Sequence, residues 1–275
     1  MPAIQTPKSV PELLKLMARH GKRSVLLSGI DPASERTPAG KVAIDLTGVA
    51  PLQEIEKKRD KVTIGTGLNL GRVARDAVGE NGLLRQAASI IANPLVRNRV
   101  TLVEALRPDS PYFDITTPLV LLEARVRLQS AAGRRTMPIR DFLEATPKGL
   151  KKGELPTALE FSQLHPQQKV GFFRVASVGA KGSVSVAIRM KLIRMVCQEP
   201  EIVVSSLRLI PLRARLSEKE LAGKPANEES IKKASEIAAE EILTLAKKDN
   251  AYERSLIEIA VARTLRGIIE GGMPA

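Results

Sequence analysis

Apolar residues recur at helical spacing near the start of the chain. The segment PKSVPELLKLMARHG, residues 7–21, places Leu13, Leu14 and Leu16 among polar residues. Ser9 stands where a helix N-cap is expected, a proline and an acid follow in the first turn, and a glycine ends the segment. The pattern therefore predicts a helix between Ser9 and the terminal glycine.

Two short apolar runs, SVLLSG and KVAIDL, follow this segment and are separated by a stretch rich in proline and glycine. Runs of this length bounded by turn residues are typical of strands, so the chain is expected to open with a helix and two strands. Next, DKVTIGTG predicts a strand that leads into the helical pattern NLGRVARDAVGENG. A further helix is expected over LLRQAASIIAN.

The middle of the chain changes period within one segment. Residues 116–128 begin as an apolar helix and pass into alternating Arg125, Val126, Arg127 and Leu128, which is typical of a half-buried strand. The segment TMPIRDFLEATPKGLKKGELPTALEF, residues 136–161, predicts the end of a strand, a short helix, a polar turn and another strand.

The last third combines strands with long helices. Period-two apolar positions predict a strand at Val184, Val186, Ile188 and Met190. EIVVSSLRLIPLRARL predicts the next pair of strands, and helices are expected at residues 228–247 and 251–270. The last third is therefore expected to form a small sheet backed by helices.

Composition limits the classes of protein that remain. Of the 275 residues, 43% are hydrophobic but only 3% are aromatic, so the core must be aliphatic. This length is sufficient for two or three units. We expect units at residues 1–60, 61–160 and 166–275. The joint before the last unit is expected in the polar stretch 147–156 or in LHPQQK just after it.

Net charge and chemistry-bearing residues narrow the function. The formal charge is +13, and residues 147–216 hold 12 Lys and Arg against 4 Asp and Glu. Few aromatic platforms accompany these charges, so a docking face for an acidic partner, or a solvated surface, is favoured over nucleic acid. The single cysteine, Cys197, excludes an internal disulfide and fits a cytoplasmic protein. His20, His165 and Cys197 form no recognisable catalytic or metal-binding motif, and no apolar run is long enough to cross a membrane.

One glycine motif imitates a nucleotide-binding turn. In KVTIGTGLNLG, Gly65 and Gly67 stand between a predicted strand and a predicted helix, as in the dinucleotide motif G-x-G-x-x-G. The third motif position is Leu70, and no acid follows about 20 residues later to bind a ribose. A tight strand-to-helix turn without a ligand is therefore the favoured interpretation.

The order of segments resembles one family over nearly the whole chain. The passages are TPKSVPELLKLMARHG, KVAIDLTGVAPLQEIEKKRDKVTIGTGLNLGRVA, IANPLVRNRVTL, FFRVASVGAKGSVSVAIRMKL and NAYERSLIEIAVARTL. In this order and spacing they resemble the medium, FAD-binding subunit of the molybdenum hydroxylases, such as xanthine and carbon monoxide dehydrogenases.

The resemblance implies both a fold and a role. The fold would consist of two α+β subdomains that hold FAD, followed by the C-terminal unit. The role would be electron transfer to FAD from 2Fe-2S clusters of a small subunit, which in turn receives electrons from a large molybdopterin subunit. The resemblance further implies a set of cofactor-binding positions: Ser28, Gly29, Ile64, Gly65, Arg97, Asn98, Thr101 and Asp114.

The chain departs from the family pattern where FAD phosphates are expected. Val103, Glu104 and Ala105 stand in place of Gly-Gly-Asn, and the first phosphate loop keeps one glycine, Gly29. Glycines let the main chain approach a diphosphate, whereas a β-branched residue disfavours the required conformations. A carboxylate about 4 Å from a phosphate charge would add about 4 kcal/mol of repulsion at an effective dielectric of about 20.

Several hypotheses follow from these observations. The first is a medium subunit that keeps the fold and assembly surfaces but has lost ordinary FAD binding, with the flavin-carrying version as a close second. Arg97, Arg99 and Arg107 could alternatively hold phosphate in another geometry. A structural interpretation is also open: Arg97 and Asn98 would fix a loop, and Asp114 would cap the helix that follows it. The alternative from another class is a stand-alone scaffold or nucleotide-binding protein derived from this fold.

Overall fold

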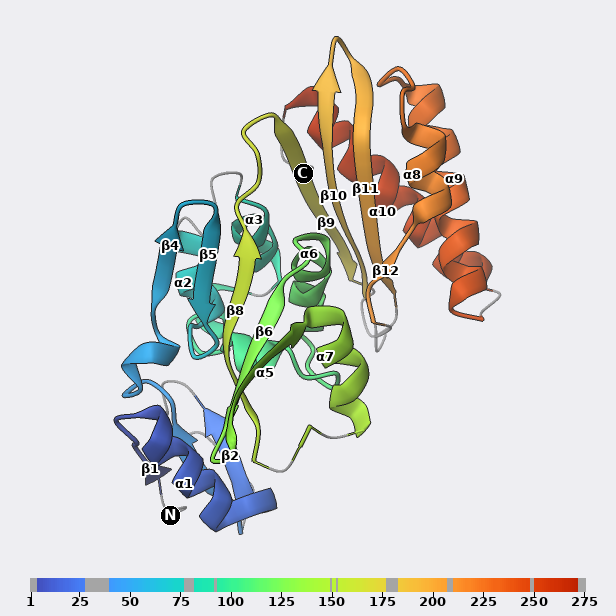
Figure 1. Ribbon diagram of the computed structural model, residues 1–275. Coiled ribbons are helices and arrows are strands. Elements are labelled where there is room, and N and C mark those ends of the chain that lie inside the picture. The colour runs from blue at the N-terminus through green and yellow to red at the C-terminus, as the bar shows by residue number, and fades with distance from the viewer. Residues whose placement is uncertain are drawn as a thin grey trace.

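The computed structural model describes residues 4–27, 40–76, 82–91, 93–148, 150–151, 153–176, 183–206, 210–247 and 250–271. The described chain is built around three separate sheets, which follow one another in the sequence (Figure 1). Each sheet has its own set of helices, and the elements of the N-terminal unit lie at the opposite end of the molecule from the C-terminal helices.

The N-terminal unit is a small parallel sheet with one helix. Its strands are β1 (Ile4–Gln5), β2 (Ser24–Leu27) and β3 (Val42–Asp45), in the order β1-β3-β2. Helix α1 (Val10–His20) begins after Ser9, whose side chain accepts from the Glu12 amide at 3.3 Å, and ends at Gly21 with φ +53°. Leu13 and Ile44 are fully buried between helix and sheet.

The middle unit contains a five-stranded antiparallel sheet in the order β4-β5-β8-β6-β7. Its strands are β4 (Ile55–Lys58), β5 (Lys61–Gly65), β6 (Arg125–Ser130), β7 (Gly133–Pro138) and β8 (Leu155–Ser162). Its helices are α2 (Leu70–Arg75), α3 (Leu83–Ile90), α4 (Pro94–Arg97), α5 (Leu102–Ala105), α6 (Thr116–Leu121) and α7 (Ile139–Ala145).

The C-terminal unit is an antiparallel sheet in the order β12-β11-β10-β9. Its strands are β9 (Gln168–Ala176), β10 (Ser183–Ile193), β11 (Val196–Ser206) and β12 (Leu212–Arg213). Helices α8 (Arg215–Leu221), α9 (Glu228–Leu245) and α10 (Ala251–Glu270) complete it. Asn227 and Asn250 cap the two long helices through their side-chain oxygens.

Both faces of the C-terminal sheet are covered. Alternate residues such as Val186 and Ile188 pack with α9 and α10, whereas Ala187 joins the core of the middle unit. Helix α6 lies against β10 and β11, where the hydroxyls of Thr117 and Ser185 hydrogen-bond at 2.7 Å within the core. The middle and C-terminal units therefore share a continuous buried interface.

Most of the elements expected from hydrophobic periodicity are confirmed, including the change from helix to strand at residues 116–128. The short elements β1, β4, α4, α5 and α8 were not predicted, because two to seven residues give too little periodicity. The nine-residue strand β9 was also not predicted. Cys197 lies buried inside β11, and burial raises the pKa of its thiol. The α+β class is confirmed, while the limits of the three units stay a prediction.

Candidate functional site

A cavity of about 320 Å³ lies where the N-terminal unit meets the middle unit. We call it the α5 cavity, because Val103 and Glu104 of α5 form part of its wall. The other lining residues come from α1, β2, α7, β8 and the segments beside them: Met17, Gly21, Ser24, Val25, Leu26, Leu106, Arg107, Phe142, Thr146, Leu150, Glu154, Leu155 and Pro156. Its volume is at the lower end of the range for small-molecule pockets, about 300–1,000 Å³.

Three segments distant in sequence are tied together behind this wall. The amide of Val103 donates to the carbonyl of Thr66 at 2.8 Å, and the Thr66 hydroxyl donates to the carbonyl of Pro156 at 2.6 Å. Thr66 is buried, and Asn69 and Thr101 form an isolated antiparallel bridge beside it. The turn after β5, helix α5 and strand β8 are thus held in one arrangement.

The glycine motif after β5 serves packing. A Cβ atom at Gly65 would lie 2.3 Å from the backbone oxygen of Leu52, and one at Gly67 would lie 2.9 Å from the same atom. Real Cβ atoms essentially never approach so closely, so the main chain of this turn fits against Leu52 only without side chains. The geometry agrees with a tight strand-to-helix turn.

The amides at the start of α5 are all engaged inside the protein. Leu102 donates to the Leu68 carbonyl at 2.9 Å, and Val103 donates to Thr66. Glu104 donates to the Thr101 hydroxyl at 3.3 Å, and Ala105 donates to the Thr101 carbonyl at 2.9 Å. Thr101 is therefore the N-cap of a helical turn, and the four amides that follow it already have acceptors.

Two carboxylates belong to the wall of the α5 cavity. Glu104 is half-buried, and Glu154 is held by Arg135 through two hydrogen bonds of 2.6 and 2.8 Å. The hydrogen bond from Arg135 holds the pKa of Glu154 below its ordinary value, so this group is ionised at neutral pH. Arg107, the one arginine among the described lining residues, forms an ion pair with Asp109 at 2.7 Å.

Arg97 and Asn98 lie in the cluster of short helices behind the turn. The Arg97 guanidinium donates to the carbonyl of Ser89 in α3, and the Asn98 side-chain oxygen accepts from Arg75 of α2 at 3.3 Å. Both residues thus connect α4 to neighbouring helices, which matches the structural interpretation. Neither belongs to the wall of the α5 cavity.

Asp114 does not cap helix α6, so that interpretation is wrong. The N-cap residue is Ile115, which makes no side-chain cap hydrogen bond. The Asp114 carboxylate is 5% exposed and accepts from Arg174 in β9 and from the Ser183 hydroxyl in β10. It therefore fastens the middle unit to the C-terminal sheet, 60 and 69 residues further along the chain.

The remaining candidates are placed as follows. Ser28 and Gly29 lie outside the described residues. Ile64 is fully buried in the middle sheet opposite Leu159, so its side chain serves the core. Thr101 directly precedes α5, and Gly65 directly precedes Thr66, which accepts from the Val103 amide, but neither lines the α5 cavity. Asp114 lies at another interface. Thr66 and Glu154 were missed, and no local pattern could have indicated that residues so far apart share one site.

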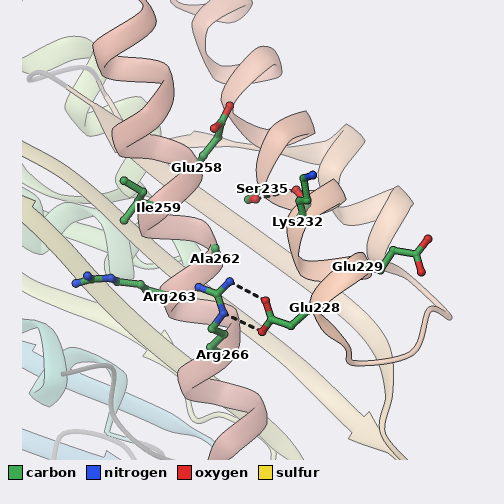
Figure 2. A pocket seen from close by; sticks show the side chains of 9 residues that line it. All are labelled: Glu228, Glu229, Lys232, Ser235, Glu258, Ile259, Ala262, Arg263 and Arg266. Carbon is green, nitrogen blue, oxygen red and sulfur yellow. Dashed lines mark hydrogen bonds and ion pairs between the residues drawn. The ribbon is translucent and has the colours of Figure 1, made fainter.

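A second hollow, of about 700 Å³, lies along helices α9 and α10 (Figure 2). Arg266 of α10 and Glu228 of α9 join across it through hydrogen bonds of 2.9 and 2.7 Å. This pairing lowers the pKa of Glu228 and raises the pKa of Arg266. The main charged pair of this hollow therefore holds α9 and α10 together.

Comparison with known proteins identifies the family. Residues 2–161, more than half of the chain, match the family described as the FAD binding domain in molybdopterin dehydrogenase. The chain belongs to this family. The resemblance noted in the sequence is thereby confirmed.

Two relatives illustrate the similarity. The glyceraldehyde dehydrogenase medium chain of Sulfolobus acidocaldarius is 25% identical over 231 residues, 82% of each chain. The xanthine dehydrogenase FAD-binding subunit of Escherichia coli O157:H7 is 22% identical over 245 residues, 85% of this chain and 84% of the relative. The class of medium or FAD-binding subunit is thus confirmed, and a stand-alone scaffold is not favoured.

The fold is also shared with solved structures. Quinoline 2-oxidoreductase from Pseudomonas putida 86 aligns with a TM-score of 0.80 and 20% identity, covering 99% of this chain and 98% of that chain. This likeness confirms the predicted α+β fold of the FAD-binding subunits. In the part of the chain that the structure describes, no helix is both long enough and apolar enough to cross a membrane.

Proposed function

We propose that this protein is the medium subunit of a cytoplasmic molybdenum-hydroxylase-type oxidoreductase complex. Its partners would be a small subunit with 2Fe-2S clusters and a large molybdopterin subunit. Family membership and relatives named as medium or FAD-binding subunits support this role. The basic chain, with a formal charge of +13, is suited to acidic partners.

Within that role, we propose that the α5 cavity binds an FAD diphosphate weakly or not at all. The observation that carries this proposal is the set of engaged amides from Leu102 to Ala105. A diphosphate is held by main-chain N–H groups that point at it, and these four amides point at acceptors of the protein itself. The Val103 and Glu104 side chains occupy the wall, and Glu104 adds a negative charge.

Val103 and Glu104 thus do not fit the diphosphate group of FAD, whereas the two glycines of the family pattern would. The subunit would then act mainly by holding the complex together. The flavin-carrying alternative is favoured by the cavity itself, whose wall is largely apolar, and by Arg107 beside it. Both alternatives keep the medium-subunit role, and flavin analysis separates them.

Co-purification tests the role. The protein is expressed with its candidate small and large subunits and isolated by a tag on this chain. A stoichiometric complex containing iron, sulfide and molybdopterin is the expected result. A free monomer in the presence of both candidates would contradict the medium-subunit role.

Flavin released on denaturation tests the cavity proposal. We expect much less than one FAD for each chain in the isolated complex. Bound FAD in equal amount to the protein would overturn the proposal.

A substitution series tests which side chains matter. Glu104→Gln removes only the charge, and Val103→Gly combined with Glu104→Gly removes both obstructions. We expect FAD affinity to rise about tenfold with the first change, about 1.4 kcal/mol, and further with the double change. Glu144→Gln, at an exposed glutamate of α7, is the matched control and should leave affinity unchanged. Equal affinity in all variants would place the obstruction elsewhere.

A further inference from the structure

A separate crevice of about 490 Å³ lies between the middle unit and the C-terminal sheet. Its lining residues come from the end of α6, the starts of β6 and α7, strand β11 and the segment in which β12 leads into α8. Figure 1 shows the places of these elements. We call it the arginine crevice, because Arg125, Arg140, Arg213 and Arg215 line it. It shares none of its described lining residues with the α5 cavity.

One of these arginines is neutralised by the protein. Arg213 donates to Glu218 at 2.7 Å and lies 3.3 Å from Glu201. Glu201 is also held by Arg189 at 2.8 and 2.9 Å, so two guanidinium groups share its charge. The charge of Glu201 is therefore already shared and does not offset the positive charges of the other three lining arginines, which we call the outer arginines. Glu123 is the other acid among the described lining residues.

The outer arginines carry the excess charge. Arg125 and Arg215 are exposed, and neither makes an ion pair with any residue that the structure describes. Arg140 pairs with Glu144 of its own helix at 3.3 Å, and both side chains are about half exposed, so solvent screens the pair. At least two guanidinium groups, one at the start of β6 in the middle unit and one at the start of α8 in the C-terminal unit, are thus available to an incoming anion.

The floor of the arginine crevice is aliphatic. Leu121, Ala124 and Val203 line it and are buried. Next to Arg215, the side chain of Leu216 is 61% exposed. Arginine is enriched in protein interfaces, where its planar fork binds carboxylates. A small ligand inside the crevice would leave Leu216 uncovered, whereas a polypeptide segment that runs out of the crevice would cover it.

We propose that the arginine crevice docks a segment of a partner subunit that bears two or more carboxylates beside an aliphatic or aromatic side chain. The carboxylates bind Arg125 and Arg215, and the apolar side chain enters the crevice between them. This inference rests on the proposed function, because it requires an assembled complex. It adds the place and the chemistry of one contact.

Charge reversal in the co-expressed complex tests the inference. Arg125→Glu with Arg215→Glu should weaken association of one partner subunit at least about tenfold at low salt, with a smaller difference at high salt. Arg19→Glu with Arg85→Glu, at exposed arginines of α1 and α3, gives the same change in net charge and should have no such effect. Arg125→Gln with Arg215→Gln is a milder variant, and thermal unfolding of each free chain checks its folding.

A cross-link identifies the docked segment. Cys197 is fully buried, so Leu216→Cys creates a uniquely accessible thiol among the described residues for a photoactivatable cross-linker. The expected product joins this chain to a partner peptide rich in Asp or Glu. A cross-link to a neutral or basic peptide would overturn the proposal.

The outcomes separate the two proposals. If the wild-type chain forms no complex, the proposed function fails and the inference fails with it. If the wild type assembles and the charge-reversed chain assembles equally well, only the inference fails. ADP is the probe for a small anion: saturable binding that the Arg125→Glu and Arg215→Glu pair abolishes, without an assembly defect, would assign the crevice to a nucleotide-like ligand instead.

Discussion

The contact of Asp114 with the C-terminal sheet gives the sharpest stability prediction. Asp114→Ala removes a carboxylate that is 5% exposed and receives hydrogen bonds from Arg174 and Ser183. Removing one partner of a buried ion pair costs about 3–5 kcal/mol. Because the Arg174 side chain is 20% exposed, water can partly solvate it in the variant. We therefore expect the free energy of unfolding to fall by about 3 kcal/mol.

A double-mutant cycle measures the pairwise part of this effect. Urea unfolding of Asp114→Ala, Arg174→Ala and the double variant should give a coupling free energy of about 2 kcal/mol. Amide hydrogen exchange should show weaker protection in β9 and β10, because these strands lose their attachment to the middle unit. A mere helix cap at this position would cost about 1 kcal/mol and show no coupling to Arg174.

An exposed pair serves as the control. Asp109 binds Arg107 at 2.7 Å, but their side chains are 68% and 61% exposed. Asp109→Ala should therefore change stability by less than about 1 kcal/mol. A coupling between Asp114 and Arg174 below about 0.5 kcal/mol would refute the reasoning that burial makes this contact strong.

Two further predictions concern the middle sheet. Gly65→Ala should lower the free energy of unfolding by about 3 kcal/mol, because the new methyl group meets backbone of Leu52. Gly71→Ala should cost less, about 1 kcal/mol, because its obstacle is the side-chain oxygen of Asn98, which can move away by giving up its hydrogen bond from Arg75; equal costs in urea unfolding would contradict this account. Burial alone would raise the pKa of Glu160, but hydrogen bonds from Lys61 and Arg127 outweigh it and lower that pKa. A lowered pKa stabilises the folded state above the unfolded-state value of about 4.3 and ceases to do so as pH falls through the folded-state value. Glu160→Gln should therefore be less stable than the wild type at pH 7, with the difference shrinking below about pH 4; a difference constant with pH in urea unfolding would rule this out.

Local sequence determined most of the longer elements of this protein. Ser9 is the N-cap of α1, and the alternating residues from Val184 to Met190 lie in one strand. Caps, turns and periodicity act over a few residues, so they can be interpreted before any tertiary contact is known. The ordered similarity of five segments also indicated the family, because together they record the element order of the fold.

The site itself was only partly predictable. Thr101 was expected to bind a cofactor, which stays a prediction; in the structure it caps α5 and accepts from the amide of Glu104. The replacement of glycines by Val103 and Glu104 was visible in the sequence. The acceptors of the Leu102 and Val103 amides were not visible, because the turn after β5 brings the carbonyls of Leu68 and Thr66 there.

Tertiary structure alone decided which distant residues meet. Strand β8 enters the sheet between β5 and β6, which places the Pro156 carbonyl on the hydroxyl of Thr66, 90 residues earlier. Asp114 reaches Arg174 and Ser183, and Arg125 lines the same crevice as Arg215. Such contacts depend on the order in which strands pair and on the packing of one unit against another. No periodicity within a segment carries that information, because it arises only when the whole chain is folded.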